Sequence, residues 1–203
     1  MGKTKIATSF LLLLFSFITT TTFSQNSYKD SIQSYLKNYV DTHDVISGDD
    51  KKYFRFYEPD KNYRVKAKFT KVNDGKWFKM ETSGVIKKTF RVYGTLNFTI
   101  HDTALALNIY QMQSLMEDEK YKDYLFLPFT DLTSGEESYH AGRYLDFKIA
   151  EIKNGQLEID FNKAYSPSCA YVSGKYNCPV PPRENNLAVA IRAGEKNFAK
   201  AHN

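Results

Sequence analysis

The sequence predicts a mainly β protein, an antiparallel meander that closes into a barrel or folds as a two-sheet sandwich, with one amphipathic helix at its N-terminus. Three observations predict this class. Apolar and polar residues alternate with period two over much of the chain beyond residue 62, the connections are short, and the 15 Tyr and 15 Phe favour strands. A chain of 203 residues can bury one sizeable core, and nothing in its pattern indicates a second domain.

Residues 1–24 have the composition of a secretory signal peptide. Lys3 and Lys5 precede the uncharged apolar run "IATSFLLLLFSFI", and Thr22 to Ser24 supply small residues before an expected cleavage at Gln25. The run is shorter than the ~20 residues of a membrane span. We therefore expect a protein exported to the periplasm or the extracellular space, with a single β-rich domain over residues 25–203 and no membrane span after cleavage. An uncleaved anchor is the alternative.

The expected helix follows directly in "NSYKDSIQSYLKNYVDTH". Its apolar residues recur at spacings of three and four, which places them on one stripe that can pack on a core. They are Tyr28, Ile32, Tyr35, Leu36, Tyr39 and Val40.

Period two dominates the next segments. In "NYRVKAKFT", Tyr63, Val65, Ala67 and Phe69 alternate with basic residues, and "NDG" (73–75) signals a hairpin into "KWFKME". The clearest strand is "TFRVYGTLNFTI", whose apolar residues are expected on one face: Phe90, Val92, Leu96, Phe98 and Ile100. Gly94 interrupts that face, as at a bend or a close backbone approach.

Further strands are expected after the turn "HDT", in "ALALNIYQMQ" and in "YLFLPF". The segments "RYLDFKIAEI" and "GQLEIDFN" are expected to pair as a hairpin. A three-residue loop at 153–155 gives both strand faces a consistent character, with Ile149 opposite Ile159 and Phe147 opposite Phe161. "NLAVAIRAGE" is expected as the last of eight or nine strands.

Cys169 and Cys178 are the only cysteines, and they lie in a segment (166–185) that holds four of the six prolines. In an exported chain the leading interpretation is a disulfide. A metal clip, a reactive thiol and a pair of small buried hydrophobes are the alternatives. A zinc site needs about four ligands at characteristic spacings. The histidines show none, so no metal or cofactor is expected: His43, His101, His140 and His202.

The C-terminal part resembles a prokaryotic family, the domain of unknown function 1684 family. The resemblance rests on "LFLPFTDLTSGEESYHAGRYLD", "DFNKAYSPSCAY" and "CPVPPRENNLAVAIRAGEK", about 75 residues in all. It extends less distinctly over the strands from Tyr63 to Tyr110. The family has no established reaction, so the resemblance implies a defined structural unit but no activity.

Polar residues gather at the ends of the expected strands in the same region. Because strand ends from separate hairpins can converge at one rim, we expect a site for a small polar or sugar-like molecule there. The candidate ligand contacts are Arg143, Asp160, Asn162, Tyr165, Glu184, Asn185, Arg192 and Glu195. Asp131, Asp160 and Glu184 are the candidate acids and bases if the protein is instead a hydrolase. A third possibility is a structural or envelope-assembly protein in which these residues only hold the fold.

The charge balance excludes a nucleic-acid partner. Without residues 1–24 the formal net charge falls from +5 to +3, and the lysines are scattered among acids. The sequence does not identify the ligand, a reaction or the oligomeric state.

Overall fold

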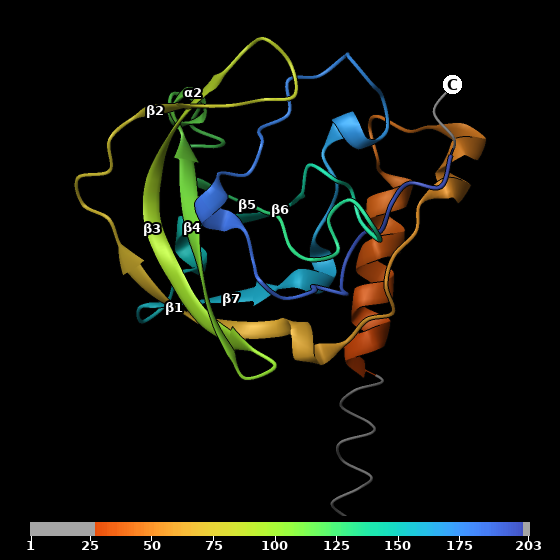
Figure 1. The fold of residues 1–203 in the computed structure, drawn as a ribbon, viewed down its shortest axis with the longest axis horizontal. Coiled ribbons are helices and arrows are strands. Elements are labelled where there is room, and N and C mark those ends of the chain that lie inside the picture. The colour runs from red at the N-terminus through yellow and green to blue at the C-terminus, as the bar shows by residue number, and fades with distance from the viewer. Residues whose placement is uncertain (1–26, 201–203) are drawn as a thin grey trace, which may run out of the picture.

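The computed structural model describes residues 27–200, which form one antiparallel sheet curled into a half-barrel (Figure 1). The predicted signal peptide and its cleavage point lie outside these residues. The strands are β1 (Arg64–Lys71), β2 (Phe78–Met80), β3 (Lys88–Ile100), β4 (Thr103–Met112), β5 (Tyr124–Phe129), β6 (Arg143–Lys148) and β7 (Gln156–Asp160). Their order across the sheet is β6-β5-β4-β3-β1-β7, with β2 paired to β3. The mainly β, antiparallel class is confirmed, as a curled single sheet.

The described residues contain one longer helix, and the other helical elements are short. Residues 27–41 are helical and bury Tyr28, Ile32 and Leu36. A single turn, α2 (Gln113–Met116), follows β4. The other helical elements are 3-10 turns: η1 (Gly48–Tyr53), η2 (Lys61–Tyr63), η3 (Ile149–Glu151), η4 (Phe161–Lys163), η5 (Ser168–Ala170) and η6 (Arg183–Asn185).

The two faces of the sheet carry separate apolar clusters. The larger one joins Leu96, Leu107, Leu127, Leu145 and Ile159 to the C-terminal segment. The smaller one, on the opposite face, is mostly aromatic and contains Met80, Phe90, Tyr110, Phe126 and Tyr144. Strand alternation explains the division, because neighbours such as Leu125 and Phe126 point to opposite faces.

At Gly94 the apolar side chains of β3 switch from one face of the sheet to the other. The register with β4 shifts between Val92 and Gly94, so Phe90 and Val92 contact the aromatic cluster while Leu96 and the residues beyond it contact the larger one. The expectation that all of these residues share one face is therefore wrong, since a bulge reverses the alternation. The close approach expected at Gly94 is confirmed, because an added Cβ would lie 2.2 Å from the Phe69 ring.

The hairpin at residues 101–102 is confirmed. Ile100 pairs with Thr103, and His101 and Asp102 both have positive φ. The "NDG" segment, by contrast, does not join two paired strands. β1 and β2 both pair with β3, so residues 72–77 connect two strands that follow one another along the same edge of β3.

The expected hairpin between β6 and β7 is wrong. β6 pairs with β5, whereas β7 pairs with β1, placing Val65 opposite Ile159. Between them the chain leaves the sheet as η3 and returns through a two-residue turn, with Asn154 and Gly155 both at positive φ. β6 instead meets the chain that follows β7, through the single bridge between Tyr144 and Tyr165. The two edge strands consequently diverge and leave an opening in the barrel wall.

The expected last strand is also wrong. Residues 186–195 run within the curve of the sheet (Figure 1) and bury Leu187, Ile191 and Ala193, but their isolated bridges are to Thr130 and Phe56, which lie outside the strands. In place of a neighbouring strand, some of their backbone groups bond to loop backbone, as between the Leu187 N–H and the Thr130 carbonyl, and others bond to side chains.

Candidate functional site

Arg143 provides most of those side-chain contacts. Its guanidinium is fully buried and donates to the carbonyl oxygens of Ile191 (2.8 Å), Ala193 (2.5 Å) and Glu195 (3.1 Å). The Ala193 and Glu195 carbonyls share one guanidinium nitrogen, and Gly194 between them has a positive φ of 75°. One planar guanidinium therefore replaces the donors of a missing strand.

Asp131 completes this arrangement. Its carboxylate accepts from the Arg143 guanidinium at 2.9 Å and from the backbone N–H groups of Thr133 and Ile191. Both side chains of the ion pair are fully buried. Since every oxygen of Asp131 is engaged and closed to solvent, this candidate acid is part of the fold.

Asn185 is bound in a similar way at the other end of the C-terminal segment. Its side-chain amide donates to the carbonyls of Asn108 and Pro128, and its oxygen accepts from the Asn108 N–H. The adjacent Glu184 is exposed. Arg192 is exposed too, in an ion pair with Glu137 at 2.9 Å. These three candidate contacts do not converge on one cleft.

Glu195 lies in a buried network of tyrosines. Tyr171 donates to both carboxylate oxygens (2.7 and 2.8 Å), and Tyr39 and the Ser166 N–H also donate to it. Burial raises the pKa of Glu195 to about 7, although these donors and the Arg143 charge oppose the rise. This side chain connects the helix over residues 27–41 to the segment that precedes the disulfide.

Asp160 and Asn162 form a fourth polar group at the end of β7. The Asp160 carboxylate accepts from the Tyr28 hydroxyl at 2.9 Å and from the Asn162 backbone and side chain. The Asn162 amide also donates to the Asp60 carbonyl. The sequence-predicted residues therefore do not form one site: some are buried hydrogen-bonding groups, Glu184 and Arg192 are exposed, and only Asp160 and Tyr165 line the cleft described below.

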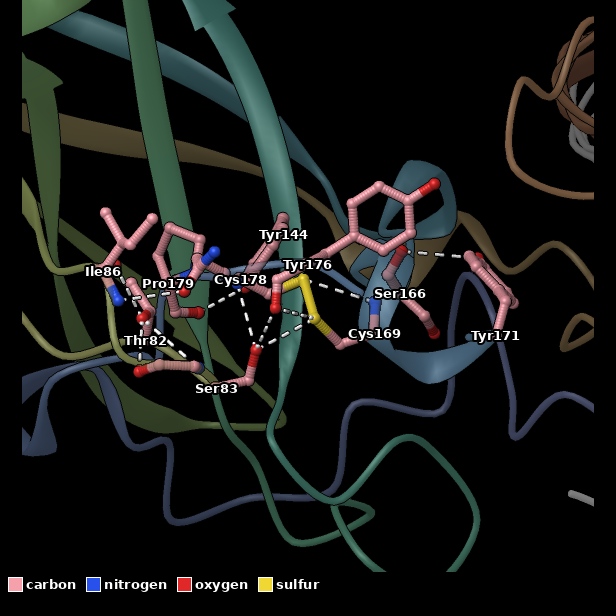
Figure 2. The surroundings of a disulfide bond; sticks show 12 residues. Thr82, Ser83, Ile86, Tyr144, Ser166, Cys169, Tyr171, Tyr176, Cys178 and Pro179 are labelled. Atoms are coloured by element: carbon pink, nitrogen blue, oxygen red, sulfur yellow. Dashed lines mark hydrogen bonds between the residues drawn. A yellow bond between two sulfur atoms is a disulfide. The ribbon is translucent and has the colours of Figure 1, made fainter. Parts of the chain in front are cut away.

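The disulfide between Cys169 and Cys178 is present, as the sequence predicted (Figure 2). Ser83, from the β2–β3 connection, accepts from the Cys178 N–H at 3.1 Å, and its own N–H donates to the Cys178 carbonyl. The Tyr144 hydroxyl donates to the Pro179 carbonyl. These hydrogen bonds hold residues 166–182, in which the disulfide closes a loop, over the aromatic face of the sheet, and no described cysteine is left to act as a free thiol.

Replacing both cysteines with serine is expected to lower the free energy of unfolding by about 3 kcal/mol, because the crosslink closes a loop of about ten residues in the unfolded chain. Urea denaturation of the variant and of the reduced wild type should give similar losses. Alkylation of the unreduced wild type in denaturant should label no cysteine, and labelling of both would contradict the disulfide.

A cleft lies in the opening between β6 and β7. It is a groove of about 580 Å³, within the range usual for small-molecule sites. Asp160 and Tyr165 are the sequence-predicted residues that line it. The others on its wall include Tyr35, Lys66, Asp146, Glu151, Lys153, Gln156, Glu158 and Lys163.

Asp146 is one of the polar residues that line this groove. Its carboxylate accepts from the hydroxyls of Tyr124 (2.5 Å) and Tyr165 (2.8 Å). The residue is open to solvent, yet protein surrounds its carboxyl group on most sides. That enclosure raises the pKa of Asp146, and the two phenol donors oppose the rise. Burial and the negative charges of Asp146 and Asp160 likewise raise the pKa of Tyr35.

Sequence patterns did not single out Asp146. Alternation along β6 places it on the face of Tyr144 and Lys148, but its partners Tyr124 and Tyr165 come from distant segments. One signal could have identified Asp146. It is a carboxylate on a strand face that carries large aromatic residues, and it pairs with Phe126 of β5.

Residues 27–200 contain no group of three or more His, Cys, Asp or Glu residues arranged to hold a metal ion. No helix in the same range combines the length and apolar character that crossing a membrane requires.

These features define a β-rich half-barrel protein with a side-chain-bound C-terminal segment and an open groove at its seam. The chain belongs to the family described as protein of unknown function DUF1684, whose model matches residues 52–196. The resemblance in the C-terminal motifs is thereby confirmed. No match was found among curated proteins.

The fold is similar to that of an uncharacterized protein of Haloarcula marismortui, determined by solution NMR. The TM-score is 0.61 at 28% sequence identity, over 90% of this chain and 95% of the other. The similarity supports the fold without adding an activity.

Proposed function

We propose that the protein is exported and binds a small, neutral, sugar-like ligand in the groove between β6 and β7. The observation that carries the proposal is the groove itself, an opening of about 580 Å³ lined by carboxylates, ammonium groups and phenol rings.

The mixed charge of the groove favours a neutral polyhydroxy ligand. Four acids line it (Asp146, Glu151, Glu158 and Asp160) together with three lysines (Lys66, Lys153 and Lys163), so their charges nearly cancel. Sugar hydroxyls both donate and accept hydrogen bonds, and they can therefore use carboxylate acceptors and ammonium donors at once. The Tyr35 ring, which is 39% exposed, offers an apolar surface for the face of a sugar ring.

Binding is favoured over hydrolysis by the positions of the acids proposed from sequence. Asp131 is buried in its ion pair, Glu184 is exposed outside the groove, and Asp160 is engaged by Tyr28 and Asn162. These three carboxylates cannot form an acid–base pair across one substrate. The burial of Arg143, Asp131 and Asn185 instead supports a structural role for the C-terminal motif.

Export is supported by the disulfide, because such bonds persist in oxidising compartments. The sequence pattern of residues 1–24 supports the same location. A periplasmic or extracellular protein would meet glycans of the cell envelope directly.

The test is a thermal-shift screen of mono- and oligosaccharides, followed by calorimetry on Asp146→Asn. The substitution keeps the shape of the side chain and removes its charge, and we expect binding of any ligand found to weaken at least ~10-fold, or ~1.4 kcal/mol.

Asp74→Asn is the matched control, because Asp74 is exposed and does not line the groove. It should bind as the wild type does. A screen without any stabilising saccharide, or equal affinity of the Asp146 variant and the wild type, would refute a sugar site in this groove.

A further inference from the structure

A second pocket lies on the aromatic face of the sheet, beneath the segment fastened by the disulfide. Its volume is about 260 Å³. The sheet supplies one wall through β3 and β5, and the disulfide segment supplies the other through Pro167, Cys178 and Pro179. Figure 2 shows Tyr144 beside Cys178 and Pro179 at this boundary.

The wall formed by the sheet is aromatic. The rings of Phe90 and Phe126 stack with centroids 5.6 Å apart, and Tyr144 meets Phe126 edge to face at 4.7 Å. The phenol hydroxyls are directed to other partners, since Tyr144 donates to the Pro179 carbonyl and both Tyr124 and Tyr165 donate to Asp146. Because their hydroxyls are engaged elsewhere, the rings of these tyrosines are available to contact a bound molecule.

Lys88, the first residue of β3, is the one cation that lines this pocket. It is half-buried, and its burial lowers the pKa of the ammonium group. Within residues 27–200 no carboxylate forms an ion pair with it, whereas the adjacent Lys87 is paired with Glu81. A partly desolvated ammonium group without a counter-charge favours the approach of an anion.

We propose that this pocket binds a small anionic amphiphile, whose carboxylate or phosphate contacts Lys88 while its aliphatic or aromatic body lies against Phe90, Phe126 and Tyr144. The volume is below that of a typical drug-sized site, which limits the ligand to a short chain or a single ring.

The rim of the pocket provides further apolar surface. Asn177 lines the pocket, and its side-chain oxygen accepts from the N–H of Ile86, in the β2–β3 connection. Ile86 is 62% exposed and the neighbouring Val85 is 94% exposed. An alkyl chain that extends beyond the pocket would cover these side chains and gain hydrophobic contact.

This proposal does not depend on the sugar site. Tyr165 lines both cavities, but the groove lies at the β6–β7 seam and the second pocket lies over β3 and β5. Lys88 lines the second pocket and not the groove, so its substitution tests this proposal separately from the sugar site.

The experiment compares octanoate, octanol and octylamine by calorimetry and thermal shift on the purified protein. Octanoate is expected to bind most tightly, octanol at least tenfold more weakly and octylamine not at all. Equal binding of octanoate and octylamine would refute an anion site. Sedimentation with phosphatidylglycerol vesicles then distinguishes a lipid headgroup from a free acid as the anion source.

Lys88→Gln should weaken octanoate at least tenfold and leave octanol unchanged, and Lys88→Arg should retain octanoate binding. The matched control is Lys79→Gln, because Lys79 is exposed on the neighbouring strand and its ammonium group donates to Thr89. An unchanged octanoate affinity in the folded Lys88→Gln variant would overturn the proposal. If that variant does not fold, the comparison of the three ligands on the wild type decides.

Discussion

Replacing Arg143 with methionine is expected to lower the free energy of unfolding by about 3–5 kcal/mol, the usual cost of removing one partner from a buried ion pair. The substitution leaves the Asp131 carboxylate buried without its cation. It also leaves the carbonyls of Ile191, Ala193 and Glu195 without the guanidinium donors. Urea denaturation monitored by circular dichroism measures the loss.

Two further variants separate the possible causes. Arg143→Lys keeps the charge, but a single ammonium group cannot reproduce the planar set of donors, so most of the loss should remain. Arg192→Ala removes an exposed partner of Glu137 and should cost less than about 1 kcal/mol.

The result discriminates between two roles for Arg143. A ligand contact at a solvent-accessible site would leave the stability of the unliganded protein nearly unchanged. A surface ion pair contributes less than about 1 kcal/mol. If the free energies of unfolding of Arg143→Met and the wild type differ by no more than that, the buried pair does not hold the C-terminal segment.

Local patterns predicted the parts of the fold that depend on local geometry. Alternation in "NYRVKAKFT" identified β1, the turn at His101 and Asp102 was identified from its residue types, and Gly94 marked a close approach. The cysteine pair followed from composition and the expected compartment. In each case the information lies within a few residues of the feature.

Strand pairing could not be predicted in the same way. The alternation of residues 156–160 is equally compatible with pairing to the segment 143–152 or to β1, because Ile149 in the first and Val65 in the second are both apolar neighbours for Ile159. The structure places Val65 there. The choice depends on how the whole sheet curls, and it also opens the groove that the sequence did not reveal.

The grouping of the candidate site residues could not be predicted for a related reason. Sequence identified the polar residues near the strand ends but not which of them are buried. Arg143 and Asp131 have the residue types of a binding site, yet the absence of a strand partner for residues 186–195 makes them internal donors and acceptors. Asp146 was overlooked because its two tyrosine partners are brought together only by the sheet.

Glu195 is expected to make the stability of the protein depend on pH. Burial raises its pKa to about 7 in the folded state, against 4.5 as the ordinary value. Between these two values the folded protein retains a proton that the unfolded chain releases. The stability associated with this group is therefore fully present below pH 4.5 and falls as the pH rises to about 7, by about 3 kcal/mol in all.

Glu195→Gln should remove this dependence, because glutamine stays neutral and can still accept from Tyr171 and the Ser166 N–H. Urea denaturation at several pH values should show the variant gaining about 3 kcal/mol relative to the wild type between pH 4.5 and pH 8. Glu137→Gln is the control of opposite sign, since its hydrogen bond and ion pair with Arg192 lower the pKa of Glu137. A difference between the Glu195 variant and the wild type that stays constant with pH would show that the buried carboxyl is ionised throughout, with Arg143 and the two tyrosines compensating its charge.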